Sequence, residues 1–324
     1  MELSRRSWLY AGLTLPLLGR SAPAQSFPEN RPIRWVVPFP PGGQTDSTAR
    51  LTAQGLATAL PANIVVDNRV GGQGTVGSDQ VRQSPPDGHT LLCSASIFAL
   101  GRHVLKGTRY DPQADFQPVA RVGEAPLLFL AANSVPANTL AELIASARRE
   151  PQRYSFALSS LGSAGHLAAI EFNRLAGVDI SMVPYRGAAA ALNDVISDSV
   201  QLYIDAGVAA LQHVRAGRMK VLAITTAERS PLARDVPTAA ESGMPGLVFN
   251  SWYGVWAPRG LPPAILDKLA DGLQRTVASE EVHRQFIAVG TLPVFEGPAA
   301  FAAFMARDIE RNVALLRAAK FEPE

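Results

Sequence analysis

Short apolar segments rich in β-branched and aromatic residues alternate with amphipathic segments along nearly the whole chain, and this alternation limits the possible folds most strongly. In the first hundred residues, Ile33–Phe39, Ile64–Asp67 and Thr90–Ser94 have the composition of buried strands. Between them, Asp46–Leu60 has helical apolar spacing, and a second helix is expected near Ser78–Gln83. This β-α-β-α-β order predicts a parallel sheet with right-handed crossovers.

The alternation resumes after Ala125-Pro126 and predicts a second α/β unit. The expected strands are Leu127–Ala131, Tyr154–Leu158, Ser181–Val183, Gln201–Asp205, Lys220–Thr225 and a segment near Val248–Ala257. The expected helices are Thr139–Arg149, Ser163–Leu175, Ala188–Ile196 and Ala209–Ala216. The C-terminal helices expected at Pro263–Ala278, Glu281–Val289 and Pro298–Ala319 can belong to either unit. No linker of low complexity separates the two units.

The first 24 residues have the pattern of a secretory signal peptide. Arg5 and Arg6 precede the apolar run Ser7–Gly19, and small residues follow, so cleavage is expected near Ala24. The run is too short for a bilayer, which needs about 20 residues. We therefore expect a periplasmic protein. The Arg5-Arg6 pair also fits a twin-arginine signal, and the export route stays open.

Composition and charge exclude several classes of function. Hydrophobic residues make up 47% of the chain and charged residues 18%, which is typical of globular proteins. Beyond residue 24, 27 basic residues balance 27 acidic ones, so bulk charge favours neither nucleic acid nor an anionic membrane. The sequence has no G-x-S-x-G, H-E-x-x-H or C-x-x-C motif, and its five histidines are scattered. We therefore expect no catalytic residue, no metal site and no cofactor.

Glycine-rich loops at the ends of predicted strands are the best candidates for ligand contact. The loop Pro38–Asp46 follows a strand and opens a helix, and bare amides at a helix N-terminus attract anions. It lacks the lysine of a phosphate-binding P-loop, and Asp46 would repel phosphate, which favours a carboxylate. The alternative is a tight turn capped by Thr45. The loop Asn68–Gly77 offers four glycines, or is simply a flexible turn.

The second half offers a similar set. Ser159–His166 lies between a predicted strand and helix and forms another anion-type cradle, although a lone histidine such as His166 is more often structural. Arg186, after the next strand, can pair with a carboxylate or remain an exposed loop charge. Asp205 can accept hydrogen bonds from a ligand or cap the following helix.

Taken together, several strings resemble those of one family. They are Arg31-Pro32-Ile33, Val36–Gly43 with Thr45-Asp46, Val66–Arg69, Gly71–Gly77, Pro86–Leu92, His166–Ala168, Val183–Gly187, Ala216–Lys220, Asp235–Thr238, Glu241–Gly243 and Trp256–Pro258. On these strings the chain resembles the periplasmic substrate-binding proteins of tripartite tricarboxylate transporters, the Bug-type receptors. The resemblance covers essentially the whole mature chain.

The resemblance implies a two-lobe, Venus-flytrap α/β fold in which each lobe is a mostly parallel sheet flanked by helices. The implied division is residues 25–125 for lobe 1, 126–250 for lobe 2 and 251–324 returning to lobe 1, with crossing strands near Pro126 and Trp252. The implied ligand contacts are Pro41, Gly42, Gly43, Gln44, Thr45, Asp46, Thr75, Ser94, Ser96, Ser160, Ser163, His166, Tyr185, Arg186, Gly187 and Asp205. Ile97–Arg102 and Leu161 depart from the family pattern and bear on ligand choice.

Three functions remain under consideration. The first is a monomeric receptor that closes on a small carboxylate and passes it to a membrane permease of the tripartite transporter. The second is a sensor subunit with the same ligand and no transport role. The third is a periplasmic hydrolase that uses His166 and Asp205. The sequence does not identify the acid.

Overall fold

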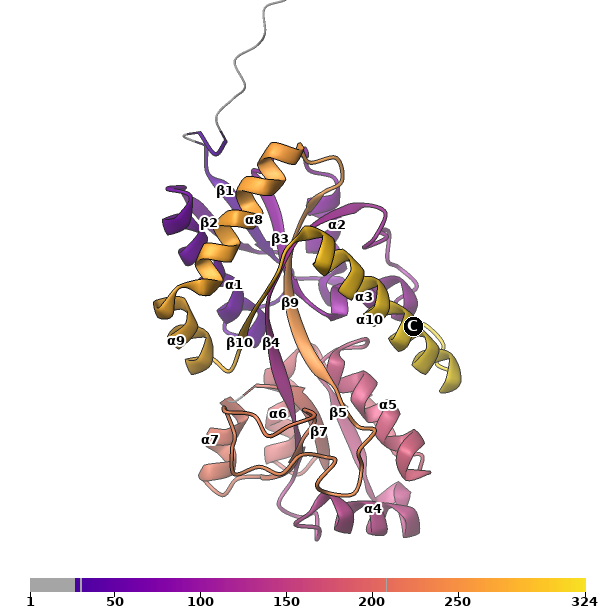
Figure 1. Ribbon diagram of the computed structural model, residues 1–324. Helices are drawn as coiled ribbons and strands as arrows, with labels where there is room; N and C mark the ends of the chain where they lie inside the picture. Colours follow the sequence, from indigo (N-terminus) through magenta and orange to yellow (C-terminus); the bar gives the residue numbers. More distant parts are fainter. Residues whose placement is uncertain (1–26, 30, 208) are drawn as a thin grey trace, which may run out of the picture.

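The protein folds into two lobes connected by two long strands (Figure 1). This computed structural model describes residues 27–29, 31–207 and 209–324, so the predicted signal peptide lies outside the described residues. Among the described helices, none combines the length and apolarity needed to cross a membrane.

The sheet of lobe 1 has the strand order β2-β1-β3-β9-β4-β10. Its members are β1 (Ile33–Val37), β2 (Ile64–Asn68), β3 (Thr90–Ala95), β4 (Phe116–Ala131), β9 (Asn250–Pro258) and β10 (Leu292–Glu296). The first three pair in parallel, as the alternation predicted. In contrast, β9 is antiparallel to both β3 and β4, and β10 is antiparallel to β4.

The sheet of lobe 2 has the order β8-β4-β7-β5-β6. It uses the second half of β4 with β5 (Ser155–Leu158), β6 (Ser181–Pro184), β7 (Leu202–Ala206) and β8 (Lys220–Ile224). The pairs of β5 are parallel, whereas β7 and β8 are antiparallel to β4. The two-lobe α/β fold is confirmed, but the expectation of mostly parallel sheets is wrong. Both sheets are mixed, because the connecting strands β4 and β9 run antiparallel to the strands beside them.

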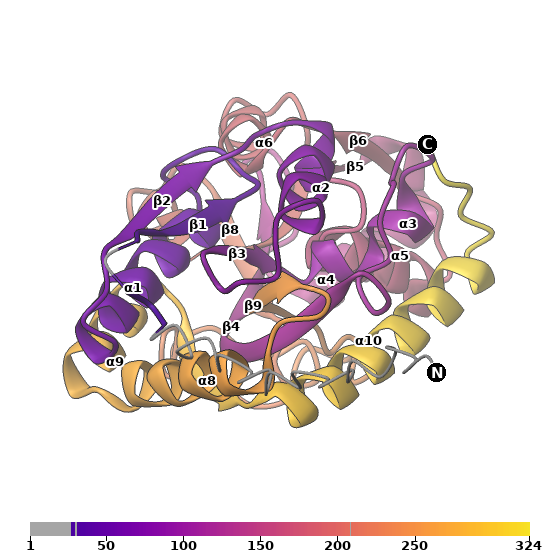
Figure 2. The same cartoon turned by 90° about the horizontal axis from the view of Figure 1, so that it is seen from above.

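Helices cover both sheets. Those of lobe 1 are α1 (Gln44–Ala59), α2 (Thr75–Arg82), α3 (Ile97–Val104), α8 (Pro263–Ala278), α9 (Glu280–Ala288) and α10 (Pro298–Ala318), with the short 3-10 turn η1 (Gly72–Gly74). Those of lobe 2 are α4 (Leu140–Arg149), α5 (Ala164–Ala176), α6 (Ala188–Ile196) and α7 (Ala209–Arg215), with the turn η2 (Pro151–Arg153). Figure 2 shows α1, α8 and α9 gathered on one side of the molecule.

Apolar residues pack on both faces of the first sheet. One cluster joins alternate residues of the strands, such as Trp35, to Leu56 of α1 and Leu273 of α8. Helices α1 and α8 approach closely because both carry a glycine at the contact. A Cβ at Gly55 would lie 2.3 Å from the Thr276 side chain, nearer than atoms can pack. This close approach fixes α1, whose N-terminus enters the candidate site, against the lobe.

The strand β4 differs most from the sequence-based expectation. Only Leu127–Ala131 was predicted, yet the strand begins at Phe116 and passes through both lobes. Its first half carries Pro118 and Gly123 and shifts register twice against β9, so it does not show strand periodicity. Ala125 and Pro126, where the sequence suggested the end of lobe 1, lie within this strand opposite β9.

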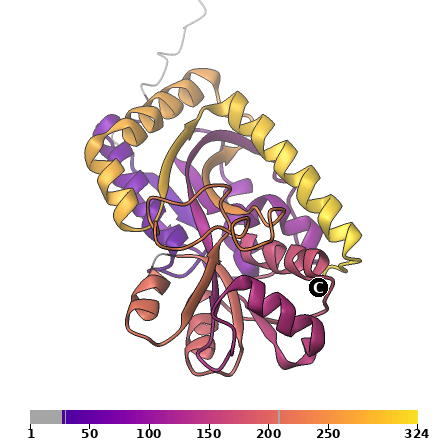
Figure 3. The ribbon, with the colours of Figure 1, turned by 60° about the horizontal axis from the view of Figure 1, so that its bottom comes forward.

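The C-terminal helices pack mainly on lobe 1, and α10 also touches lobe 2. Helix α10 contacts α3 and β4 of lobe 1 and α5 of lobe 2. Figure 3 shows α10 (yellow) ending beside α5, close to the C-terminus. Beyond α10, the Glu324 amide donates to the Val104 carbonyl, while the Phe321 ring packs edge-on against His166. The last residues therefore contact both lobes.

Candidate ligand-binding site

The candidate loops of the two lobes meet along one edge. On lobe 1, Gly74 of η1 lies so close to Phe39 that an added Cβ would be 3.1 Å from its ring. From the same turn, the Gln73 side chain accepts hydrogen bonds from Ser160 and from the Leu161 amide, in the β5–α5 loop of lobe 2. Contacts therefore run from the β1–α1 loop through η1 to the β5–α5 loop, where the two lobes meet.

The buried side chain of Asp46 stabilises the β1–α1 loop through hydrogen bonds. It is 2% exposed, and its Oδ2 accepts from the Gly42 amide and from Arg50 Nε, both at 2.9 Å, while its Oδ1 accepts from Asn68 Nδ2 at 2.8 Å. Burial opposes ionisation, but these hydrogen bonds outweigh it and lower the pKa of the carboxyl group. The carboxylate that the sequence placed among the ligand contacts is thus occupied by the chain itself and holds the loop in shape.

The N-terminus of α1 has no side-chain cap. Gly43 is its N-cap residue, in an extended conformation with φ −76°, and Pro41, Gly42 and Gly43 are exposed. The Thr45 side chain, the alternative cap considered from the sequence, makes no such bond. The Gln44 side chain turns away and donates to the Val289 carbonyl and to Thr291 Oγ1. Amides at this terminus thus keep their positive end for an anion.

The glycine loop before α2 takes conformations that glycine adopts easily. Gly71, Gly72 and Gly74 all have positive φ, and Gln73 between them has φ +54°. Thr75 is half-buried, and its hydroxyl donates to the Gly72 carbonyl at 2.9 Å, so the side chain stabilises its own turn.

The end of β3 brings two serines to the same edge. Ser94 is fully buried, and its hydroxyl has no hydrogen-bond partner among the described residues. The Ser96 amide donates to the Trp252 carbonyl of β9, which fixes the start of α3. An unpaired buried hydroxyl costs free energy, so the Ser94 hydroxyl has a hydrogen bond left to make.

The β5–α5 loop uses most of its own donors. The Leu161 amide donates to Gln73, the Gly162 amide donates to His166 Nδ1 at 3.0 Å, and Ser163 caps α5 by accepting from the His166 amide. Unlike the terminus of α1, this cradle is thus largely satisfied by side chains. Its free capacity for a ligand is smaller than the sequence alone suggested.

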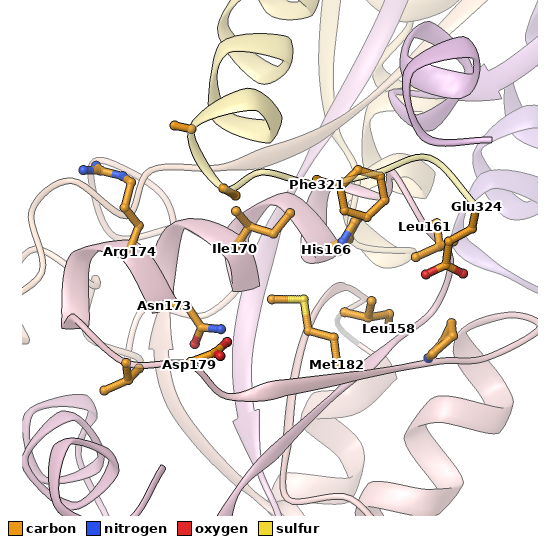
Figure 4. A pocket seen from close by; sticks show the side chains of 14 residues that line it. Leu158, Leu161, His166, Ile170, Asn173, Arg174, Asp179, Met182, Phe321 and Glu324 are labelled. Atoms are coloured by element: carbon orange, nitrogen blue, oxygen red, sulfur yellow. The ribbon is translucent and has the colours of Figure 1, made fainter. Parts of the chain in front are cut away.

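His166 lines a pocket that contains none of the other predicted contact residues. The pocket, about 470 Å³, is lined by α5, β6 and the C-terminal segment, and Figure 4 shows the His166 ring beside Phe321. The ring is 2% exposed, and burial lowers its pKa to about 4, so it is neutral at physiological pH. Since Nδ1 accepts from the Gly162 amide, the ring shapes the β5–α5 loop from behind, which is the structural role considered from the sequence.

The β6–α6 loop contributes Tyr185, Arg186 and Gly187. The Tyr185 hydroxyl donates to Asp194 Oδ2 at 2.6 Å, and partial burial together with this carboxylate raises its pKa to about 12. Arg186 is exposed. Gly187 has φ +118° and its amide donates to the Ser159 carbonyl, which ties this loop to the β5–α5 loop.

Asp205 lies at the carboxyl end of β7, next to the first turn of α5. A Cβ at Gly165 would lie 1.8 Å from the Ile204 carbonyl oxygen, so only glycine allows this approach. Asp205 Oδ1 accepts from the Ala206 amide, and the Tyr203 hydroxyl bonds to Oδ2. Burial raises the Asp205 pKa to about 6, against hydrogen bonds from Tyr203, the Ala206 amide and Ser159 that lower it. This carboxyl group therefore titrates close to neutral pH.

Two residues of this region were missed from the sequence. Gln73 is the only side chain within the run Gly71–Gly74, and a lone polar residue among glycines was the available signal. Tyr203 precedes Asp205 by two residues, the spacing that places both on one face of a strand.

The described residues hold no group of three or more histidine, cysteine or acidic side chains arranged to bind a metal ion. Among the described residues, His166 and Asp205, the two side chains considered for a hydrolase, make no hydrogen bond to each other. His166 bonds to the Gly162 amide, and Asp205 bonds to Tyr203 and the Ala206 amide.

Comparison with known proteins gives consistent matches along the chain. The profile of the family described as "Tripartite tricarboxylate transporter family receptor" matches residues 48–320. Protein BugT of Bordetella pertussis is 36% identical over 310 residues, covering 94% of this chain and 95% of BugT.

Solved structures agree with these matches. An R. palustris protein with adipate has a TM-score of 0.86 and 35% identity, covering 92% of this chain and 100% of that chain. MatC from Rhodopseudomonas palustris with bound malate has a TM-score of 0.80 and 32% identity, covering 90% of this chain and 100% of that chain.

Proposed function

The chain belongs to the tripartite tricarboxylate transporter receptor family, and on this premise we propose that it captures a small organic acid between its lobes. The acid carries at least one carboxylate and is held without chemical change. In this proposal the protein acts in the periplasm as the solute-binding receptor of a transporter.

The observation that carries the proposal is the uncapped N-terminus of α1, whose preceding loop packs against η1, the turn that bonds to lobe 2. The exposed residues Gly42 and Gly43 lead into its first turn, and the helix adds a partial positive charge of about half an elementary charge. Asp46 occupies the Gly42 amide and keeps the loop in position. A carboxylate, rather than phosphate, suits a cradle that has an anionic side chain directly behind it.

Relatives with known ligands support the same class of solute. The two similar structures hold adipate and malate, which are both dicarboxylates. For this chain we propose that one carboxylate bonds to the terminus of α1. We propose that Thr75, Ser94 and Ser96 add contacts to the ligand from lobe 1. From lobe 2, the proposed contacts are Ser163, Tyr185–Gly187 and Asp205.

Closure follows from contacts that exist only when the lobes approach. A ligand bonded to both lobes favours the closed form by the free energy of the contacts that the open form lacks. The strands β4 and β9 join the lobes and provide the hinge. The closed form then docks on the permease; a sensor role would use the same closure with a different partner.

The experiment is a thermal-shift screen of linear dicarboxylates, each paired with its neutral diamide of the same length. A bound ligand at about 100 times its dissociation constant stabilises the protein by roughly 2.7 kcal/mol. We expect the acids to raise the melting temperature and the diamides to leave it unchanged. Equal shifts from acid and diamide, or no shift from any acid, would contradict the proposal.

A further inference from the structure

A side chain of lobe 1 already bonds to the ligand-facing loop of lobe 2. Gln73 Oε1 accepts from Ser160 Oγ at 2.9 Å and from the Leu161 amide at 2.8 Å. These bonds join residues 87 and 88 positions apart in the chain. In both bonds the acceptor is the same side-chain oxygen of Gln73. A carboxylate oxygen of a ligand could accept from the same two donors.

The backbone at Gln73 is unusual for a residue with a side chain. Its φ of +54° and ψ of 37° fall in the left-handed region, where only a few per cent of non-glycine residues are found. The adjacent positions that need positive φ are glycines, so a glycine at this position would fit as well. Strain of this kind is retained where the surrounding contacts hold it in place.

The turn that carries Gln73 is anchored to lobe 1. Its neighbour Gly74 is buried, and an added Cβ there would be 3.1 Å from Phe39 and 3.6 Å from Pro38. The Gly74 amide also donates to the Gly71 carbonyl at 2.9 Å. Because this turn packs against Phe39 and Pro38, the bonds from Gln73 connect the β5–α5 loop of lobe 2 to the β1–α1 loop of lobe 1.

We propose that Gln73 is a positioning residue that latches the two lobes together through its side-chain oxygen. Its amide oxygen holds the β5–α5 loop against lobe 1, and the Ser160 hydroxyl serves the latch rather than the ligand. Another contact of this loop with lobe 1, between Gly162 and Val104, is apolar and has no comparable direction.

The latch itself depends only on the geometry of the lobes, whereas its effect on affinity rests on the proposed function. A protein that is already partly closed binds more tightly, because the apparent dissociation constant varies inversely with the fraction of competent molecules. Gln73 thus raises affinity without touching the ligand.

The test measures the distance between the lobes in ligand-free protein. Spin labels on cysteines introduced at the exposed positions Thr58 of α1 and Ala189 of α6 report the open and closed populations. The native Cys93 is buried, and burial raises its thiol pKa to about 12, which keeps it from reacting with the label. Gln73→Gly removes the latch and suits the backbone, so the loop keeps its conformation.

We expect Gln73→Gly to raise the ratio of open to closed molecules on the order of 10-fold, as the loss of two hydrogen bonds implies. Gln73→Glu keeps an acceptor oxygen at the same reach and remains as closed as the wild type. Adding Ser160→Ala to Gln73→Gly opens the lobes no further, since Ser160 acts through Gln73.

The matched control is Gln83→Ala, which removes a glutamine amide that donates only to Asp79 on its own helix. It leaves the distances unchanged. Identical distributions in Gln73→Gly and the wild type overturn the latch, and so does a Gln73→Glu variant as open as Gln73→Gly. Because no ligand is added, failure of the acid screen leaves this result unaffected. Where an acid binds, Gln73→Gly also raises its dissociation constant.

Discussion

Replacing Asp205 by asparagine removes a charge that the fold disfavours, and the effect depends on pH in a defined direction. Burial raises the pKa of this carboxyl group to about 6, compared with 3.8 for an ordinary aspartate. Its contribution to stability is therefore complete below pH 3.8 and is lost as pH rises through about 6. Asparagine has no such loss and still accepts a hydrogen bond from Tyr203.

The magnitude follows from the two pKa values. Their separation corresponds to about 3 kcal/mol at 1.36 kcal/mol per pH unit, and most of it falls between pH 4 and pH 7.5. We expect the stability of Asp205→Asn relative to the wild type to increase by about 2 to 3 kcal/mol over this interval.

Guanidinium unfolding of both proteins at pH 4 and pH 7.5, without ligand, measures this difference directly. Asp271→Asn, on the exposed face of α8, controls for the loss of one negative charge per molecule. A stability difference that is the same at both pH values, or that favours the wild type at pH 7.5, would refute the assignment of a raised pKa to the carboxyl group at the end of β7.

Three further substitutions test the scaffold by chemical unfolding. Arg121→Met leaves Glu296, which now makes two bonds to the guanidinium, without its partner beside β4, and costs about 3 kcal/mol. Gly165→Ala places a Cβ on the Ile204 carbonyl oxygen and costs about 3 kcal/mol or prevents folding. Asp46→Asn destabilises the protein by about 1 to 3 kcal/mol at pH 7, and the loss shrinks as pH falls through the lowered pKa of the native carboxyl group.

Each of these substitutions has a comparison within the chain. Arg284→Met breaks only exposed ion pairs on α9 and costs at most about 1 kcal/mol. Gly107→Ala meets no atom within 4 Å and is tolerated. A cost for Arg121→Met as small as that for Arg284→Met, or free tolerance of Gly165→Ala, contradicts the packing described here. If the stability lost in Asp46→Asn increases at low pH, the hydrogen bonds described for the Asp46 carboxylate do not stabilise the fold.

The α/β alternation and the positions of the loops were predictable because they depend on local patterns. The segments Ile33–Val37 and Gln44–Ala59 show strand and helix features that a short window contains, and the structure has both within a few residues of the prediction. Helix α3 was not predicted, because Ile97–Leu100 is a continuous apolar run, fully buried, with no polar face to reveal a helical period.

The hydrogen bonds of the site were not predictable, since they join residues far apart in the chain. From the sequence, both the β1–α1 and the β5–α5 loops were predicted to bind anions. Only the fold reveals that Ser163 caps α5 while α1 has no side-chain cap. Likewise, Gln44 bonds to Thr291, 247 positions away, and no local pattern marks its side chain as occupied.

If amides at the N-terminus of α1 bind a carboxylate, removal of the Gly43 amide alone weakens binding. Gly43 has the φ of proline, and a Cβ there lies no closer than 3.9 Å to other atoms, so Gly43→Pro and Gly43→Ala both fit. The measurement is isothermal titration of both variants with an acid that stabilises the wild type. We predict that Gly43→Ala binds the acid as the wild type does and that Gly43→Pro binds it at least about 10-fold more weakly, the loss expected for one hydrogen bond to a charged group. Equal affinity of the two variants contradicts it.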